Sequence, residues 1–342
     1  MIDAPSTTDP SDESQADDAG PRIRTVMFDA DLEGDEIDPA SLDGNGSLGD
    51  QQLLWIDVQM PEAIPEGVPL YGANPEWLQP EVTDKMGAFV PEGEWRYLYV
   101  RALNWASGRK ATDEALVVAI GPNVVITTHR APIDFLTAVL DSEAGKLRVG
   151  QLEAATFAAT LLDRMLTDYL DARDEFETAL DRLELLILRR PRSKCLGQLQ
   201  HLRRVASRLR RYLAVQRDLF DAVGRPDFDP DQSELVAKHY RLLSARYSKV
   251  MLATETAREL VNGSFDLYSS RVAEATNDTM HRLTFITVAL GTLSVVAGVL
   301  GMNFDAPLFN TGARGFWITV AAMSVFTVVV VWMTWRRRRG GV

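Results

Sequence analysis

The sequence predicts an α+β cytoplasmic domain, followed by long stalk helices and a two-helix transmembrane hairpin. Three observations predict this fold class. Two uncharged apolar runs lie near the C-terminus, a long segment before them contains almost no helix breaker, and short apolar runs between glycines and prolines fill the N-terminal half. The single cysteine, Cys195, excludes an intramolecular disulfide bond and fits a reducing compartment.

Residues 1–21 form an acidic segment that contains no aromatic residue. Such a composition buries too little apolar surface to offset the cost of ordering, so we expect this segment to be disordered. Of the 48 acidic residues of the chain, 17 lie in residues 1–66, against only Arg22 and Arg24. The acidic segment either concentrates cations near the protein or acts only as a solvating tail.

Residues 22–150 are predicted to form a cytoplasmic α/β domain of short strands and turns. The predicted strands cover residues 25–28, 53–58, 95–103 and 115–128. Within the last run, Gly121-Pro122-Asn123 predicts a hairpin turn, because glycine and proline favour turn conformations.

Residues 151–282 are predicted to form a cytoplasmic region of long stalk helices. Residues 151–190 contain neither glycine nor proline, and their apolar residues recur at helical spacing up to Pro191. A last helix begins after Pro230 and meets no further proline before Pro307. A helix of about 70 residues is about 100 Å long. It must run from the cytoplasmic domain into the membrane and is able to transmit motion between them.

The helix between these two, predicted for residues 194–223, is strongly basic. Its arginines are Arg203, Arg204, Arg208, Arg210, Arg211 and Arg217. A basic helix can bind nucleic acid. However, the preceding helix carries a row of acidic residues, so antiparallel packing with charge pairing between the two helices is the simpler interpretation. We therefore expect no nucleic-acid partner.

The two apolar runs, residues 283–302 and 316–335, each contain 20 residues without a charged side chain. This length spans a hydrocarbon core of about 30 Å. Because only the external loop 303–315 separates them, the helices cross and return. The tail 336–342 carries Arg336, Arg337, Arg338 and Arg339, which mark the cytoplasmic side. We expect a multi-pass protein of the cell (inner) membrane, in contact with membrane lipid, with both termini cytoplasmic.

A stripe of small or polar residues follows the first membrane helix at alternating spacings of three and four. Its members are Asn277, Met280, Thr284, Thr287, Gly291, Ser294 and Gly298. Small residues at this spacing either allow close helix packing in a membrane or line a water-filled pore. A single hairpin cannot enclose a pore, so conduction requires an oligomer with this helix innermost.

Gly301-Met302-Asn303, at the outer end of this helix, resembles the Gly-Met-Asn signature of the CorA family of divalent-cation transporters. The resemblance extends through residues 277–280 and 53–61 and covers nearly the whole chain beyond residue 22. It implies a CorA-like homopentameric funnel whose first membrane helices form the pore. It also implies a cytoplasmic constriction at Asn277 and Met280, although helix packing explains the same residues. Residues 209–218 and 315–318 resemble the ZntB zinc-transporter branch.

The external loop departs from both branches of the family. Its acidic residues are reduced to Asp305, and Arg314 lies near the expected pore mouth. By resemblance, the four arginines of the tail form a positive ring beside the pore exit. A topology anchor that touches anionic lipid is an equally good interpretation of these arginines.

The signature suits a weak site for a hydrated ion. The amide oxygen of Asn303 and the carbonyl groups of Gly301 and Met302, repeated fivefold, offer hydrogen-bond acceptors to the water shell of a divalent cation. The chain contains only four histidines and Cys195, without metal-ligand spacing, so we expect no tetrahedral zinc cage within one subunit. His281, near the membrane entry, is either a solvated residue or part of a titrating ring.

We therefore predict a membrane transporter or channel for divalent metal cations, first Zn²⁺ and then Co²⁺, Ni²⁺ and Mg²⁺. The alternative is a CorA-like pentameric scaffold or partner-binding protein with little transport. The sequence contains no nucleophile–base pair, phosphate-binding glycine loop or redox motif, so we expect no enzyme and no cofactor other than the transported cation.

Overall fold

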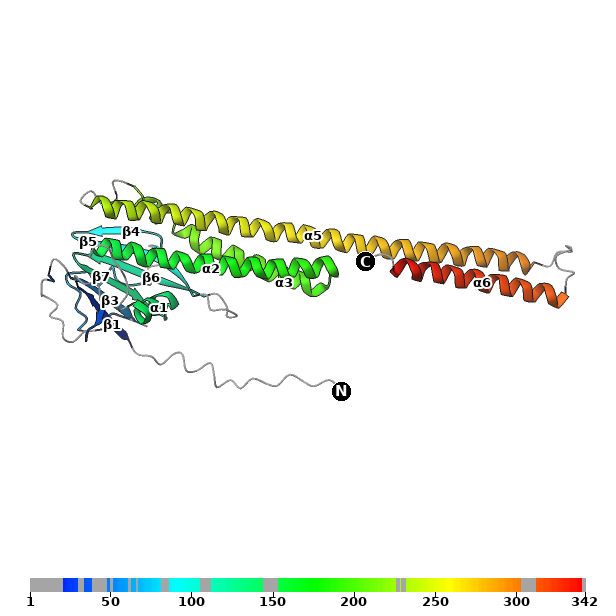
Figure 1. Cartoon of the computed structure of the whole chain (residues 1–342), viewed down its shortest axis with the longest axis horizontal. Helices are drawn as coiled ribbons and strands as arrows, with labels where there is room; N and C mark the ends of the chain where they lie inside the picture. The colour runs from blue at the N-terminus through cyan, green and yellow to red at the C-terminus, as the bar shows by residue number, and fades with distance from the viewer. Residues whose placement is uncertain are drawn as a thin grey trace. The chain divides into compact units, whose positions relative to one another are not determined.

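The computed structural model describes residues 21–29, 34–38, 48–49, 52–60, 63–65, 67–80, 86–104, 112–143, 153–225, 228, 232–302 and 312–339. Apart from Pro21, the predicted disordered segment lies outside them. The chain, drawn in Figure 1, divides into two compact units. Unit 1 consists of Met1–Leu183 and Gly197–Gly263, and unit 2 consists of Glu184–Leu196 and Ser264–Val342.

Unit 1 contains a seven-stranded mixed sheet with the order β2-β1-β3-β7-β6-β5-β4. Only β3 and β7 pair in parallel. The strands are β1 (Arg22–Phe28), β2 (Gly34–Glu36), β3 (Leu53–Gln59), β4 (Phe89–Glu92), β5 (Trp95–Asn104), β6 (Thr112–Gly121) and β7 (Val124–His129). Each predicted run therefore contains a strand, and the hairpin turn between β6 and β7 is confirmed.

The sheet is covered on both faces, and β3 shows why its sequence is almost continuously apolar. Successive side chains of a strand point to opposite faces. Leu53 and Trp55 pack into the core beneath the helices, whereas Leu54 and Ile56 pack into a second core on the other face. Partly buried residues of the segment between β3 and β4, among them Trp77, pack against this second core. Two covered faces leave no polar face on the central strands.

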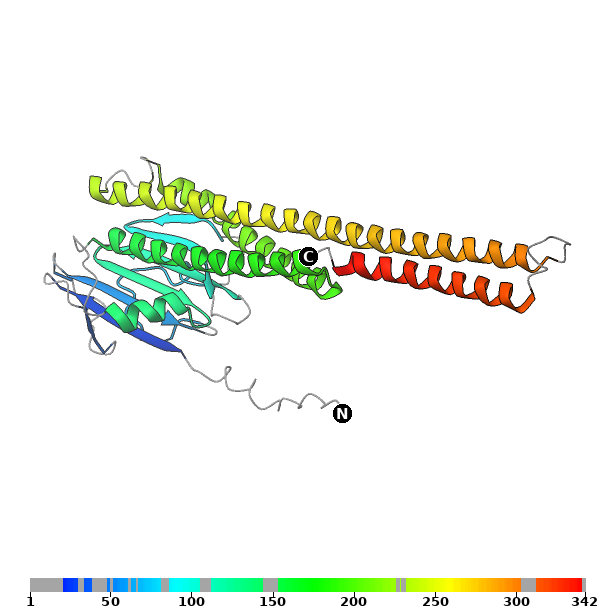
Figure 2. The ribbon, with the colours of Figure 1, turned by 45° about the vertical axis from the view of Figure 1, so that its right-hand side comes forward.

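Six helices complete the described chain. They are α1 (Asp134–Glu143), α2 (Ala154–Arg189), α3 (Ser193–Val215), α4 (Arg217–Val223), α5 (Glu234–Leu300) and α6 (Gly312–Arg339). Figure 2 shows α6 running back along the C-terminal part of α5 within unit 2. The predicted fold class, an α+β domain with long stalk helices and a C-terminal helical hairpin, is confirmed.

The second predicted helix, residues 194–223, is wrong in one respect, because it breaks at Gln216 into α3 and α4. The fully buried Gln216 side chain bonds to β5 beyond the end of β4. Its Oε1 accepts the Arg101 amide at 3.1 Å, and its Nε2 donates to the Arg101 carbonyl at 3.3 Å. Gly87 approaches the same break so closely that a Cβ atom there would lie 1.9 Å from the Val215 carbonyl oxygen.

The long helix α5 is confirmed as one continuous element of 67 residues. Its residues 234–263 belong to unit 1 and residues 264–300 to unit 2. Ser233 begins it as an N-cap, with its hydroxyl accepting the Val236 amide at 3.3 Å. In unit 1, α5 forms ion pairs with α2 and α3: Arg246 binds Asp163 of α2 at 2.8 Å, and Glu255 binds Arg210 of α3 at 3.6 Å.

Candidate functional site

The predicted pore-lining stripe lies along α5, and all seven of its residues are exposed in the single chain. Two of its hydroxyl groups donate to their own helix, Thr287 to the Leu283 carbonyl and Ser294 to the Leu290 carbonyl, each at 2.9 Å. A hydroxyl oxygen that has donated its proton still has acceptor capacity. These two hydroxyl groups therefore offer neutral oxygen acceptors to water or to a hydrated cation.

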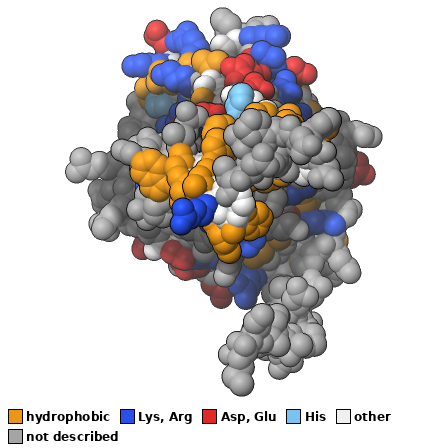
Figure 3. Space-filling view, turned by 90° about the vertical axis from the view of Figure 1, so that its right-hand side faces the viewer, with side chains coloured by type: hydrophobic (Ala, Val, Ile, Leu, Met, Phe, Trp, Pro, Cys, Tyr) orange, Lys and Arg blue, Asp and Glu red, His pale blue; other side chains and the backbone are white. Residues whose placement is uncertain are grey.

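Large apolar side chains occupy the rest of this surface. Val295 of α5 is 66 % exposed, and Ile318 of α6 is 69 % exposed. By length and composition, both helices are suited to cross a membrane. Figure 3, which looks onto the end of the molecule at which α5 ends, shows hydrophobic side chains gathered there. An apolar surface of this extent is typical of contact with lipid or with another chain.

The structure places two of the three signature residues at the C-terminal end of α5. The Gly301 amide donates to the Ala297 carbonyl at 2.9 Å, and the Met302 amide donates to the Val299 carbonyl at 3.2 Å, so both residues close the last turn. The C-terminal end of a helix carries partial negative charge and favours cations. Asn303 and Asp305 lie outside the described residues.

Two further groups of predicted electrostatic residues lie on α6. Arg314 is exposed in its first turn. The backbone of Arg336, Arg337, Arg338 and Arg339 continues the helix to its end, while their side chains lie outside the described part of the chain. The helix begins at Gly312, four residues before the apolar run that begins at residue 316. The φ of Gly312 is 62°, a left-handed conformation that glycine adopts easily.

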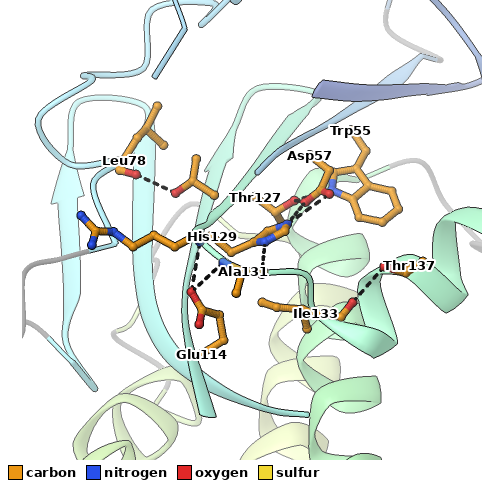
Figure 4. Close-up of polar contacts among 11 residues, drawn as sticks. Trp55, Asp57, Leu78, Glu114, Thr127, His129, Ala131, Ile133 and Thr137 are labelled. Atoms are coloured by element: carbon orange, nitrogen blue, oxygen red, sulfur yellow. Dashed lines mark hydrogen bonds and ion pairs between the residues drawn. The ribbon is translucent and has the colours of Figure 1, made fainter. Parts of the chain in front are cut away.

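Unit 1 contains a buried polar cluster that the sequence did not reveal, shown in Figure 4. The Trp55 indole donates to the Thr127 hydroxyl at 3.0 Å, and this hydroxyl donates to the Asp57 carboxylate. The same carboxylate lies 3.3 Å from Nε2 of His129, and Nδ1 of His129 lies 2.7 Å from the Ala131 carbonyl oxygen. The cluster joins β3, β7 and the turn that leads into α1.

The hydrogen-bond geometry constrains the ring of His129. Nδ1 faces the Ala131 carbonyl oxygen, which can only accept, so Nδ1 carries a proton, and Nε2 faces the carboxyl group of Asp57. Burial lowers the pKa of His129, but the hydrogen bond and charge of Asp57, with the Ala131 carbonyl and Glu114, raise it above 6.5 overall. An aspartate inside the apolar run of β3 was the only sequence signal for this pair.

The described residues contain no group of three or more histidine, cysteine or acidic side chains that could hold a metal ion. The stripe and the end of α5 present neutral oxygens rather than charged ligands, and such oxygens bind the hydration shell of a hard divalent ion weakly.

Residues 50–337 match the profile of a family described as "CorA-like Mg2+ transporter protein". The cobalt/magnesium transport protein CorA of Thermotoga maritima is 27% identical over 172 residues, which are 50% of this chain and 49% of that protein. The match thus spans about half of that relative's length. The divalent cation transporter CmaX of Pseudomonas aeruginosa is 28% identical over 257 residues, which are 71% of this chain and 72% of that protein.

Two solved structures share the fold at low sequence identity. The CorA magnesium transporter of Methanocaldococcus jannaschii has a TM-score of 0.66 at 19% identity, covering 90% of this chain and 96% of that one. The ZntB cytoplasmic domain of Vibrio parahaemolyticus has a TM-score of 0.56 at 12% identity, covering 75% of this chain and 100% of that one. At this identity the ZntB likeness concerns the fold alone.

Proposed function

Because the chain belongs to the CorA family of divalent-cation transporters, we propose that it moves divalent metal cations across a membrane through a homopentameric pore. This is a family of transporters and not of enzymes. The observation that carries the proposal is the exposed stripe on α5, which leads to the Gly301-Met302 signature at the negative end of the helix. Five such helices around one axis enclose a path lined by hydroxyl groups and small residues.

In the proposed mechanism the ion keeps its water shell. Asn303, with the carbonyl groups of Gly301 and Met302, accepts hydrogen bonds from that shell at the external mouth. Magnesium dehydrates reluctantly, so binding through the shell avoids a large cost. The stripe residues take over the contacts along the membrane, and Asn277 and Met280 narrow the path at its cytoplasmic end. Neutral ligands keep every site weak enough for the ion to leave.

The choice of ion is a finer proposal. Zn²⁺ is the cargo that we propose first, on the resemblance of residues 209–218 and 315–318 to the zinc-transporter branch. Magnesium and cobalt are the ions in the names of the relatives, which makes them the competitors to test. We propose that the protein resides in the cell (inner) membrane with both termini in the cytoplasm, as the arginines at the end of α6 favour.

The test is cation uptake by proteoliposomes that contain the purified full chain. Uptake of Zn²⁺, Co²⁺ and Mg²⁺ is followed with and without a pH gradient, in the parent, in Asn303→Ala and in Asn262→Ala. Asn262 is an exposed asparagine of α5 outside the stripe and serves as the matched control. We expect uptake that Asn303→Ala abolishes and Asn262→Ala leaves intact. No uptake of any ion by a verified pentamer would contradict transport and favour the scaffold.

A further inference from the structure

The turn between α2 and α3 exposes leucines beside basic residues. We define the hairpin tip as residues 185–194. Its leucines Leu185, Leu186 and Leu188 are 58%, 53% and 43% exposed. Its basic residues are all exposed, and they are Arg189, Arg190, Arg192 and Lys194. An exposed apolar group next to a cluster of cations is typical of a segment that binds a membrane surface.

The charge of the hairpin tip is uncompensated. No acidic residue occurs between Glu184 and Asp218, although the whole chain has a net charge of -12. Within the part of the chain that the structure describes, none of the four basic side chains of the tip forms an ion pair. Arginine presents several donors in a planar arrangement that matches a phosphate group. The tip therefore offers positive charge and hydrogen-bond donors to a phosphate-bearing partner.

The position of the tip indicates which kind of phosphate-bearing partner it contacts. The tip belongs to unit 2, the same compact unit as the apolar parts of α5 and α6. The Ser264 hydroxyl of α5 donates to the Glu184 carboxylate of α2, which fixes the height of the tip along α5. In Figures 1 and 2, α2 and α5 run in the same direction, so the tip extends from Glu184 toward the membrane run.

A distance estimate brings the tip near the headgroups. The segment of α5 from Ser264 to Leu283 spans about 28 Å at about 1.5 Å per residue, and α2 advances about 7 Å beyond Glu184. About 20 Å then separates the end of α2 from the hydrocarbon, of which the headgroup layer takes about 5 to 8 Å. Most of the remaining distance between the end of α2 and the headgroups is bridged by the long arginine side chains and by electrostatic attraction, which acts over a Debye length of about 8 Å.

We infer that the hairpin tip docks on the anionic lipid headgroups of the cytoplasmic leaflet. This inference rests on the proposed function, because it takes α5 and α6 to span the bilayer. The arginines and Lys194 bind lipid phosphates, and the three leucines lie toward the interface. A nucleic-acid partner fits less well, because single-stranded nucleic acid is bound with aromatic side chains, and the tip has aliphatic ones.

The experiment places a reporter on the tip of the full chain. Cys195 is replaced by serine, Ser193→Cys carries a fluorophore, and the protein is reconstituted in phosphatidylcholine vesicles with or without phosphatidylglycerol. A nitroxide on the lipid headgroup quenches the fluorophore when the two are in contact. The test variant is Arg190→Gln/Arg192→Gln. The matched control is Arg204→Gln/Arg211→Gln, which removes the same charge from exposed positions of α3 in unit 1.

We expect several-fold stronger quenching in vesicles with phosphatidylglycerol, and we expect high salt to reverse it. The tip variant should lose this increase, whereas the control variant should keep it. Equal quenching in neutral and anionic vesicles, or equal loss in both variants, would overturn the inference. An oligonucleotide that displaces the anionic headgroups from the tip, and so abolishes the quenching, would also overturn the inference. Because quenching needs no ion flux, anionic-specific quenching without cation uptake would sink the proposed transport and leave the docking intact.

Discussion

Units 1 and 2 use apolar residues in opposite ways. In unit 1 the side chains of β3 are buried from Leu53 to Val58, whereas in unit 2 Val295 and Ile318 are about two-thirds exposed. Burial removes apolar surface from water in unit 1. In unit 2 the apolar runs of α5 and α6 are exposed in the single chain, so their surroundings must cover them. Unit 1 therefore stabilises itself through its own core, whereas the apolar runs of unit 2 require surroundings outside the single chain.

The polar groups of the two units differ in the same way. Asp57 and His129 of unit 1 are buried and bind each other, as low-dielectric surroundings require. Thr287 and Ser294 of unit 2 bind their own helix and keep an open side. The Asp57–His129 pair of unit 1 therefore ties strands together, whereas the Thr287 and Ser294 hydroxyl groups of unit 2 remain accessible to water or to an ion.

A substitution that breaks the packing of unit 1 should change the free energy of unfolding most. Phe157 of α2 is fully buried, with its ring 5.2 Å from Trp55 and 5.3 Å from Phe28. Phe157→Ala should lower the free energy of unfolding by about 3 to 5 kcal/mol. Phe316→Ala, at a residue of α6 that is 63% exposed, is the matched control and should cost much less. Denaturant unfolding in detergent measures both, and equal losses would contradict the comparison.

The next effect concerns the edge of the sheet. Gln216→Ala leaves the Arg101 amide without its side-chain partner, whereas the Arg101 carbonyl keeps the Tyr169 hydroxyl at 2.8 Å. A buried unsatisfied group costs about 1 to 3 kcal/mol. Gln198→Ala changes the same residue type at an exposed position of α3 and should remain within about 0.5 kcal/mol of the parent. A destabilisation of equal size in both variants would show that Gln216 does not serve as a replacement strand partner.

Gln216 also shows where sequence reasoning reaches its limit. The long runs of apolar residues predict β3, β5, α2 and α5, because their periodicity is local. Nothing local marks Gln216 as a break, since no glycine or proline accompanies it, and its cause lies on β5. The unpredicted β2 has only three residues. The unpredicted β4 contains Pro91 and lies at the edge of the sheet, because a sheet tolerates proline only at an edge or a bulge. The unpredicted α1 has only 10 residues.

The candidate site divides in a similar manner. The stripe follows from helical spacing alone, so the sequence predicts all of its positions on one helix. The Asp57–His129 pair depends on the parallel pairing of β3 with β7, which brings together residues far apart in the chain. Sequence spacing carries no record of such a contact. The function of Asn303 rests on resemblance to the family and remains a prediction.

The stripe itself offers a smaller and more selective effect. A Cβ atom added at Gly298 meets nothing within 4 Å, so the single chain tolerates a side chain there. In a pore, five copies of Gly298→Leu would narrow the path, and uptake should fall about tenfold or more. Val295→Leu, at an exposed residue outside the stripe, is the control and should keep parental uptake. Equal uptake by both variants would place the pore on another face of α5.

The smallest expected effect is a pH dependence confined to unit 1. The pKa of His129 is raised in the folded state, so its contribution to stability is complete below pH 6.5 and is lost as pH rises through the folded value. Asp168 acts in a different window. Burial raises its pKa from 3.8 to about 7, opposed by Arg164 and assisted by Asp171 and Asp134, so stability declines as pH rises between these values.

Two substitutions separate these windows. His129→Gln should remove the decline in the free energy of unfolding above pH 6.5, and Asp168→Asn should remove the decline between about pH 4 and pH 7. Unfolding measured across this range in both variants and the parent tests the assignment. A parent whose stability rises above pH 6.5, with the rise lost in His129→Gln, would mean that the pKa of His129 is lowered and not raised in the folded state. The buried pair would then be no site of favourable charge in unit 1, and only the apolar contrast between the units would remain.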